Sequence, residues 1–335
     1  MLNVSTSLQR RLIVTAVGMG ALAFAMPSLA QSGAAPYPNK PIRIVTPFAA
    51  GGAIDVLCRV IAERLSVQLG QPVLVDPKPG ASTIVGADVV AKAAPDGYTL
   101  LITTSGTLIS NVIFFDKLPY APRDFVPITQ ISLGSVIMVA ANSAPYNNLN
   151  EFAAWAKAQG RPISFASWGI GTSGHMFGEL LKKNHGIDLN HVPYRGDVTA
   201  YTDVRGGTLD VAFGSPVSAR PLISAGHVKA IGMTGPRRPA AMPNLALFSE
   251  QGYNGFELAG FVAAYAPAGT PRAIVARLSA EFVKAIRHPE VTARMLEQGQ
   301  EPIANTPEEA ERAYALEFPK WAAMIKSTGV TATQP

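Results

Sequence analysis

The amino-acid sequence predicts an α/β protein of two domains. Short apolar runs rich in β-branched residues alternate along most of the chain with longer segments whose apolar residues recur at helical spacing. This alternation is typical of α/β domains with largely parallel sheets. The 335 residues also exceed what one hydrophobic core usually organises, so we expect two domains.

Residues 1–30 have the composition of a secretory signal peptide. Arg10 and Arg11 precede an apolar run over residues 12–26, and Ser28-Leu29-Ala30 then offers small residues at both cleavage-recognition positions. The run is too short to span a membrane and ends in a cleavage-site pattern, so we expect export and cleavage after Ala30. The paired arginines leave both the general secretory route and the twin-arginine route open.

The charge balance and the cysteine content exclude several classes of protein. The formal net charge is +5, and cleavage after Ala30 would lower it to +3 because two arginines are lost. The chain has no run of Lys or Arg, so we expect a small anionic ligand and no nucleic-acid partner. Cys58 is the only cysteine, which excludes an internal disulfide, and its apolar surroundings predict a buried side chain. The five histidines form no H-E-x-x-H motif, so we predict no metal site and no cofactor.

Strands and helices are predicted in alternation up to about residue 233. The predicted strands are Ile42–Thr46, Val73–Val75, Thr99–Thr103, Val136–Ala140, Ile163–Ala166, Leu189–Val192, Leu209–Phe213 and Val228–Met233. The predicted helices are Asp55–Leu69, Ile84–Ala93, Leu149–Ala158, His175–Asn184, Val198–Val204 and Val217–Ala225. The last third is predicted to be helical over Arg272–Arg287, Pro289–Gln298 and Pro307–Ser327, with Gly and Pro at the ends.

The first candidate site is the loop in PFAAGGAID, residues 47–55, between the first strand and the first helix. Gly51 and Gly52 would let consecutive backbone N–H groups converge on an anion at the start of the helix. Asp55 suits the first turn, where its carboxylate could accept hydrogen bonds from the loop. The alternative is an ordinary strand-to-helix turn that binds nothing.

The second candidate site is SWGIGTSGH, residues 167–175, which has the spacing G-x-G-x-x-G. The same spacing serves dinucleotides and other anions. A dinucleotide site needs an acidic residue at the end of the next strand, but that strand ends in Tyr194 and Arg195, with Asp197 shortly after. A guanidinium matches both oxygens of a carboxylate, so Arg195 favours a carboxylate ligand over a nucleotide, with a solvated surface Arg as the alternative.

Catalytic patterns are weak in this sequence. Ser173 and His175 could suggest a nucleophile and a base, but residues two apart on a helix diverge and no acid can be assigned to orient the histidine. No G-x-S-x-G motif is present. We therefore predict no catalytic residue. The alternative is an exported hydrolase or oxidoreductase that uses the loop at residues 169–174.

Several stretches together resemble one family. They are YPNKPIRIVTPFAAGG with Asp55 and Arg59, APDGYTLL, KLPYAPRDFVPI, GTSGHMFGELL, HVPYRG, GGTLDVAF and APAGTP. In this order, across nearly the whole chain after residue 30, they resemble the Bug-type solute receptors of tripartite tricarboxylate transporters.

The resemblance implies a type II periplasmic binding protein fold, with two α/β lobes and a ligand cleft between them. It places residues 31–136 and 257–335 in lobe 1 and residues 137–256 in lobe 2, with the chain crossing near Val136 and Phe256. It further implies a monomeric periplasmic protein that binds a small organic carboxylate and delivers it to a membrane permease of the tripartite tricarboxylate type. A sensing partner of a signalling receptor would share the same binding residues.

The same resemblance assigns the residues that contact the ligand. The first loop falls on Phe48, Ala49, Ala50, Gly51 and Gly52 with Asp55, and the second on Ser167, Trp168, Gly169, Gly171 and Thr172 with His175. Ser105, Tyr194, Arg195, Asp197 and Phe213 are the expected cleft walls.

Some residues depart from the family pattern. Ala50 stands where Pro is common, and PKPGASTI, residues 77–84, has lost two glycines and two asparagines that are common there. Trp168 stands where a small residue is common. We hypothesise that Trp168 adds an apolar wall that favours an aromatic or hydrophobic carboxylate; the alternative is a Trp packed away from the cleft.

Overall fold

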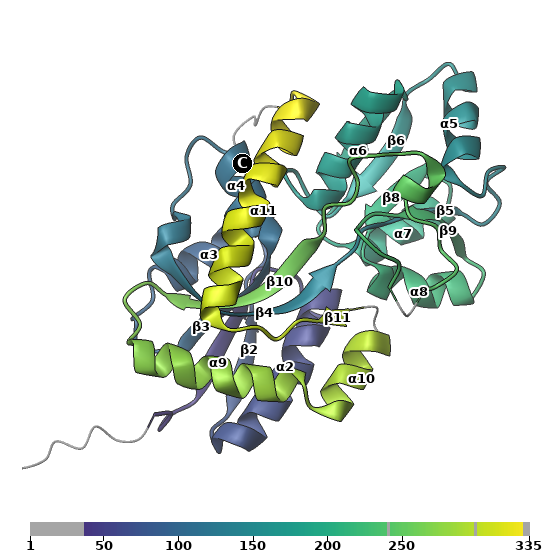
Figure 1. Ribbon diagram of the computed structural model, residues 1–335. Helices are drawn as coiled ribbons and strands as arrows, with labels where there is room; N and C mark the ends of the chain where they lie inside the picture. The colour runs from purple at the N-terminus through teal and green to yellow at the C-terminus, as the bar shows by residue number, and fades with distance from the viewer. Residues whose placement is uncertain (1–36, 240–241, 298–299, 331–335) are drawn as a thin grey trace, which may run out of the picture. The chain divides into compact units, whose positions relative to one another are not determined.

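The computed structural model describes residues 37–239, 242–297 and 300–330 (Figure 1). The predicted signal peptide lies outside the described residues, as does Gln298 at the end of one predicted helix. Two mixed β-sheets, each covered by helices, give a two-lobe α/β fold, which confirms the predicted fold class. None of the described helices is long and apolar enough to span a membrane.

The six-stranded sheet has the strand order β11-β4-β10-β3-β1-β2. Its strands are β1 (Ile42–Thr46), β2 (Val73–Pro77), β3 (Thr99–Thr104), β4 (Phe125–Gly134), β10 (Gly260–Pro267) and β11 (Glu301–Pro302). The accompanying helices are α2 (Ala53–Leu69), α3 (Ile84–Ala91), α4 (Asn111–Phe114), α9 (Arg272–Ile286), α10 (Pro289–Glu297) and α11 (Pro307–Thr328), with a π-helical segment, η2 (Gly106–Ser110). β1 pairs in parallel with β2 and β3, whereas β10 runs antiparallel to β3 and β4.

The five-stranded sheet has the order β7-β6-β8-β5-β9. Its strands are β5 (Ile137–Ala141), β6 (Ile163–Ser167), β7 (Leu189–Pro193), β8 (Val211–Gly214) and β9 (Val228–Met233). Its helices are α5 (Leu149–Ala158), α6 (Ser173–His185), α7 (Asp197–Arg205) and α8 (Pro216–Ser224). β6 pairs in parallel with β7 and β8, whereas β5 runs antiparallel to β8 and β9.

The prediction of largely parallel sheets is therefore wrong, because each sheet contains a strand of opposite direction. In the six-stranded sheet both β10 and the two-residue β11 run opposite to the other strands, and the sequence analysis missed them together with their neighbour β4. Pro127 interrupts the pattern of β4, and it is accommodated where β4 faces Tyr265 beside a register shift. The Gly at the start of β10 likewise weakens the strand signal.

Local sequence accounts for the helix boundaries. α6 ends at Gly186, whose φ of 62° gives the left-handed cap that glycine adopts without strain. α11 begins with a capping box, in which the Thr306 hydroxyl accepts from the Glu309 N–H and the Glu309 carboxylate accepts from the Thr306 N–H. Cys58 is fully buried in α2, as predicted, and burial raises the pKa of its thiol to about 12.

The chain passes between the sheets at two places that lie close together. It leaves the six-stranded sheet between β4 and β5 and returns to this sheet after β9 and before β10. The Val136 N–H donates to the Thr234 hydroxyl at 3.0 Å, and the Thr234 N–H donates to the Val136 carbonyl at 2.8 Å. The two crossing segments are therefore joined by hydrogen bonds beside the cavity described next.

Candidate functional site

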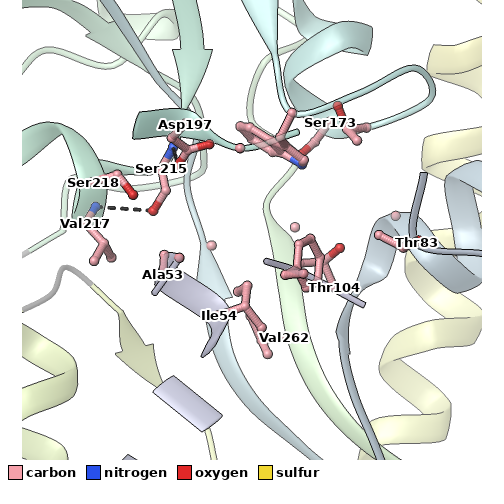
Figure 2. A pocket seen from close by; sticks show the side chains of 18 of the residues that line it. Ala53, Ile54, Thr83, Thr104, Ser173, Asp197, Ser215, Val217, Ser218 and Val262 are labelled. Atoms are coloured by element: carbon pink, nitrogen blue, oxygen red, sulfur yellow. Dashed lines mark hydrogen bonds between the residues drawn. The ribbon is translucent and has the colours of Figure 1, made fainter. Parts of the chain in front are cut away.

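A cavity of about 540 Å³ is lined by loops and helix ends that belong to both sheets (Figure 2). The first turns of α2, α6, α7 and α8 all contribute to it, so four helix N-termini meet at one space. The first N–H groups of a helix have no partner within the helix, and they carry its partial positive charge. The cavity is thereby suited to an anion.

Hydroxyl groups dominate the polar part of the lining. They belong to Ser82, Thr83, Thr104, Ser105, Thr107, Ser135, Thr172, Ser173, Thr199, Ser215 and Ser218, with the amides of Asn111 and Gln300 nearby. The main apolar side chains are Phe48, Ile54, Val136, Trp168, Val198, Pro216, Val217, Phe261 and Val262. Arg195 and Asp197 are the charged members among the described lining residues.

The loop before α2 lines the cavity, but its glycine N–H groups are already used. The Gly51 N–H donates to the Asp55 carboxylate at 2.9 Å, and the Gly52 N–H donates to the Ala49 carbonyl at 3.2 Å. The predicted convergence of the Gly51 and Gly52 N–H groups on an anion is therefore wrong. The N–H groups at the first two helical positions, Ala53 and Ile54, have no hydrogen-bond partner in the described structure and belong to cavity-lining residues.

The carboxylate of Asp55 fixes this loop through hydrogen bonds. Its side chain is 2% exposed, and its carboxylate accepts from the Gly51 N–H and from both Nε and Nη2 of Arg59. Asp55 does not line the cavity. The predicted capping role agrees with these bonds, because the carboxylate fixes a loop in which Gly51 takes a positive φ of 78°.

The loop before α6 is also closed by bonds of its own. The Gly171 N–H donates to His175 Nδ1 at 3.1 Å, and the Thr172 hydroxyl donates to the Gly169 carbonyl at 2.7 Å. A Cβ added to Gly171 would lie 3.6 Å from Asn111 Oδ1, so this turn is directed toward the segment after β3. Trp168, Thr172 and Ser173 line the cavity, whereas Gly169 and Gly171 do not.

Two stacked histidines lie beneath the α6 loop. The rings of His175 and His191 are 3.9 Å apart and nearly parallel, and His191 Nε2 lies 2.7 Å from the Ser167 hydroxyl. Burial lowers the pKa of His175 to about 4, and burial together with His175 lowers the pKa of His191 to about 3. Both rings are therefore neutral at neutral pH, and no hydrogen bond joins Ser173 to His175 within the described contacts.

Asp197 links the first turns of α7 and α8. Its carboxylate accepts from the Ser215 N–H at 2.9 Å and is also stabilised by the Ser218 hydroxyl, while the Ser215 hydroxyl accepts from the Val217 N–H (Figure 2). Burial nevertheless raises the pKa of Asp197 to about 6. Arg195 is exposed and forms no ion pair with Asp197 within the described residues.

A strained segment forms another part of the wall. Ala81, Ser82 and Thr83 all take positive φ values, of 43°, 51° and 78°, in the stretch that the sequence analysis noted for its missing glycines. The Thr83 hydroxyl accepts from Thr107 at 2.8 Å and from Asn111 Nδ2 at 3.2 Å. This buried network fixes the segment despite its backbone strain.

The predicted site residues divide into two groups. Ten line the cavity: Phe48, Ala49, Ala50, Gly51, Gly52, Ser105, Trp168, Thr172, Arg195 and Asp197. Seven do not: Asp55, Ser167, Gly169, Gly171, His175, Tyr194 and Phe213. Of the latter, Tyr194 donates to the Asp203 carboxylate, and Phe213 is 1% exposed in the core.

The sequence analysis did not select the wall residues on α8, on the strained segment and on β10. A local signal was available for α8, where Ser215 before Pro216 marks a helix start. The strained segment lies in the stretch 77–84, which the sequence analysis noted for its departure from the family pattern. Within the described residues, no three His, Cys, Asp or Glu side chains lie together as metal ligands would.

Comparison with known proteins agrees with this architecture. Residues 57–330 match the model of the tripartite tricarboxylate transporter family receptor. The chain belongs to this family. A UPF0065 protein from the tcbD-tcbE intergenic region of Pseudomonas sp. (strain P51) is 36% identical over 89% of both chains.

Two solved structures are similar to the chain over most of its length. The periplasmic binding protein BugD is 32% identical, with a TM-score of 0.83 over 89% of this chain and 100% of that chain. R. palustris Rpa4515 with adipate is 29% identical, with a TM-score of 0.84 over 88% of this chain and 99% of that chain. These similarities confirm the predicted membership of the Bug-type receptors.

Proposed function

We propose that this chain is an extracytoplasmic receptor that captures a small organic carboxylate between two lobes. The lobes comprise residues 31–136 with 257–335 and residues 137–256. The observation that carries the proposal is the cavity, which is lined from both sheets and at which four helix N-termini meet. The adipate bound in the related structure is a carboxylate of this kind.

Capture requires no bond-making. The ligand carboxylate accepts from backbone N–H groups at α2, including those of Ala53 and Ile54, and from a hydroxyl on the opposite side, such as that of Ser173. Each lobe gains its partner only when the cavity is closed around the ligand, so closure and binding form one equilibrium. Hydrogen bonds to a charged group contribute about 1.5–3 kcal/mol each, so four or five suffice for micromolar affinity, about −8 kcal/mol.

The receptor acts in the periplasm as a monomer and passes its ligand to a membrane permease of the tripartite tricarboxylate type. Family membership and the periplasmic relatives support this assignment. It has no catalytic role in this proposal: the Ser173–His175 pair that an exported enzyme would use is not hydrogen bonded, and His175 instead accepts from the Gly171 N–H. A role in ligand sensing for a signalling receptor would use the same cavity.

The test begins with protein purified without added ligand and analysed by native mass spectrometry. A thermal-shift screen of small carboxylates follows, with the corresponding neutral amides as matched controls. We expect at least one acid to raise the midpoint while its amide does not, because ligand binding to the native state stabilises it. Stabilisation by amides alone, or by no acid at all, would contradict the proposal. Small-angle scattering with the best acid should show a smaller radius of gyration, as closure requires.

A further inference from the structure

The charged groups of the cavity are distributed unevenly, and this bears on which acids it accepts. Asp197 begins α7 on one side, next to Ser215 and Ser218, and Ser173 and Thr83 lie on the other side in Figure 2. The N–H-rich ends that suit a ligand carboxylate are therefore accompanied by a protein carboxylate in the same space. We propose that Asp197 selects carboxylates that carry a hydrogen-bond donor, a hydroxyl or an amine, at their far end, and excludes dicarboxylates.

The hydrogen bonds of Asp197 leave acceptor capacity for a ligand. The protein supplies the Ser215 N–H at 2.9 Å and the nearby Ser218 hydroxyl. An ionised carboxylate offers about four lone-pair sites, so further acceptor positions remain on a group that lines the cavity. Since burial already disfavours the charged form of Asp197, an additional donor stabilises it, whereas a second carboxylate is repelled.

Arg195 does not cancel this selection. Its side chain is exposed, and it forms no ion pair with Asp197 within the described residues, although only Gly196 separates them. An exposed guanidinium attracts all anions through a screened field and so contributes little to the choice between them. Asp197, which is less exposed, therefore determines which chemical group the ligand can carry at the end opposite its carboxylate.

The cavity also has apolar walls that fit the body of such an acid. Val198 is 58% exposed and lines the cavity, as do Phe48, Trp168 and Phe261. Trp168 also packs on the first turn of α6, where a Cβ on Gly174 would lie 3.2 Å from Trp168 Cζ3. This inference rests on the proposed function, and it separates this chain from a relative that binds adipate, a dicarboxylate.

The experiment is isothermal titration of the full chain with acids of one carbon skeleton: hexanoate, 6-hydroxyhexanoate, 6-aminohexanoate and adipate. The same comparison is made with 4-methylbenzoate and its 4-hydroxymethyl, 4-aminomethyl and 4-carboxy counterparts. On the better-bound skeleton, a donor-bearing acid should bind at least about tenfold tighter than the dicarboxylate, because juxtaposed like charges are costly. The hydroxyl and amine members distinguish the two donors.

Two variants test the residue itself. Asp197→Asn keeps an oxygen for the Ser215 N–H but removes the charge, so the dicarboxylate should gain at least about tenfold and the amino acid should lose affinity. Asp203→Asn is the matched control, because Asp203 is another α7 carboxylate that accepts a hydrogen bond, from Tyr194, but lies outside the cavity lining. Asp203→Asn should leave the ratio of the affinities for the dicarboxylate and the donor-bearing acid unchanged. Asp197→Ser provides the same test should Asp197→Asn unfold.

Three outcomes overturn the inference. A dicarboxylate that binds as tightly as the donor-bearing acids, with a ratio unchanged in Asp197→Asn, refutes selection while leaving carboxylate capture intact. Tightest binding of hexanoate or 4-methylbenzoate shows that the far end prefers an apolar group. Failure of all eight acids to bind, while the wider carboxylate screen also finds no ligand, refutes the proposed function and this inference with it.

Discussion

The substitution Ala53→Pro tests whether the start of α2 holds the ligand carboxylate. Ala53 is the first helical residue, and proline is well tolerated there because its missing N–H has no partner within the helix. A proline also requires an extended residue before it, and Gly52 has φ −75° and ψ 168°. The variant should therefore fold, with the free energy of unfolding changed by no more than about 1 kcal/mol.

Binding should nevertheless fall sharply. The substitution deletes the N–H of Ala53, a residue that lines the cavity, and the proline ring occupies the place of its hydrogen. One lost hydrogen bond to a carboxylate corresponds to about 1.5–3 kcal/mol, which raises Kd by a factor of about ten to one hundred.

The assay is calorimetric titration of wild type and variant with the best acid from the screen, alongside thermal unfolding of both. Arg272→Pro is the matched control: it also changes the first residue of a helix, follows a residue with extended ψ of 135°, and lies outside the cavity lining. It should leave Kd unchanged. Wild-type affinity in a folded Ala53→Pro variant would refute the assignment of the α2 N-terminus to the ligand.

Three further predictions concern packing, pH and specificity. Gly178→Ala should lower the free energy of unfolding by about 1–3 kcal/mol or more in a denaturant titration, because its Cβ would lie 2.1 Å from Phe165; an unchanged midpoint would show that α6 does not pack this closely. The buried histidines have folded pKa values of about 4 and 3, below the ordinary 6.5, so the unfolded chain binds more protons and stability falls as pH drops below about 6.5. Unfolding at pH 7.5 and pH 5 should show a smaller pH effect in His175→Gln/His191→Gln than in wild type, and equal effects would contradict this origin. Trp168→Ser should weaken binding of an aromatic acid relative to a short aliphatic monocarboxylate by about two- to tenfold in parallel titrations, and an unchanged preference would mean that the ring does not contact the ligand.

The sequence predicted the positions of both candidate loops, but it did not predict which of their N–H groups are free to donate to a ligand. The PFAAGGAID loop does line the cavity, as its position before a helix indicates. Whether a glycine N–H is free depends on partners such as the Asp55 carboxylate and the Ala49 carbonyl, and these bonds form only in the folded loop. The local sequence pattern therefore predicted the position of the loop, whereas the tertiary structure determines which N–H groups have no partner within the protein.

The remaining wall residues could not be predicted because they come from distant segments. Ser82 and Thr83 belong to a strained turn held by Asn111 and Thr107, and nothing in their own sequence indicates those partners. Phe261 lies on β10, a strand identified only by its pairing with β3 and β4. The helices that were predicted match the observed ones to within a few residues, because helical periodicity and capping residues are local signals, whereas the short α4 was not predicted.

The order of the strands along the chain has a consequence for synthesis. The five-stranded sheet is complete in one continuous stretch from Ile137 to Met233, whereas the six-stranded sheet needs β10 between β3 and β4. Trp321 near the C-terminus is 1% exposed and packs on Phe177 of α6, so α11 joins the two lobes last. During synthesis the middle third of the chain can therefore fold first. The strands of the first third keep unpaired edges until the C-terminal residues have been synthesised.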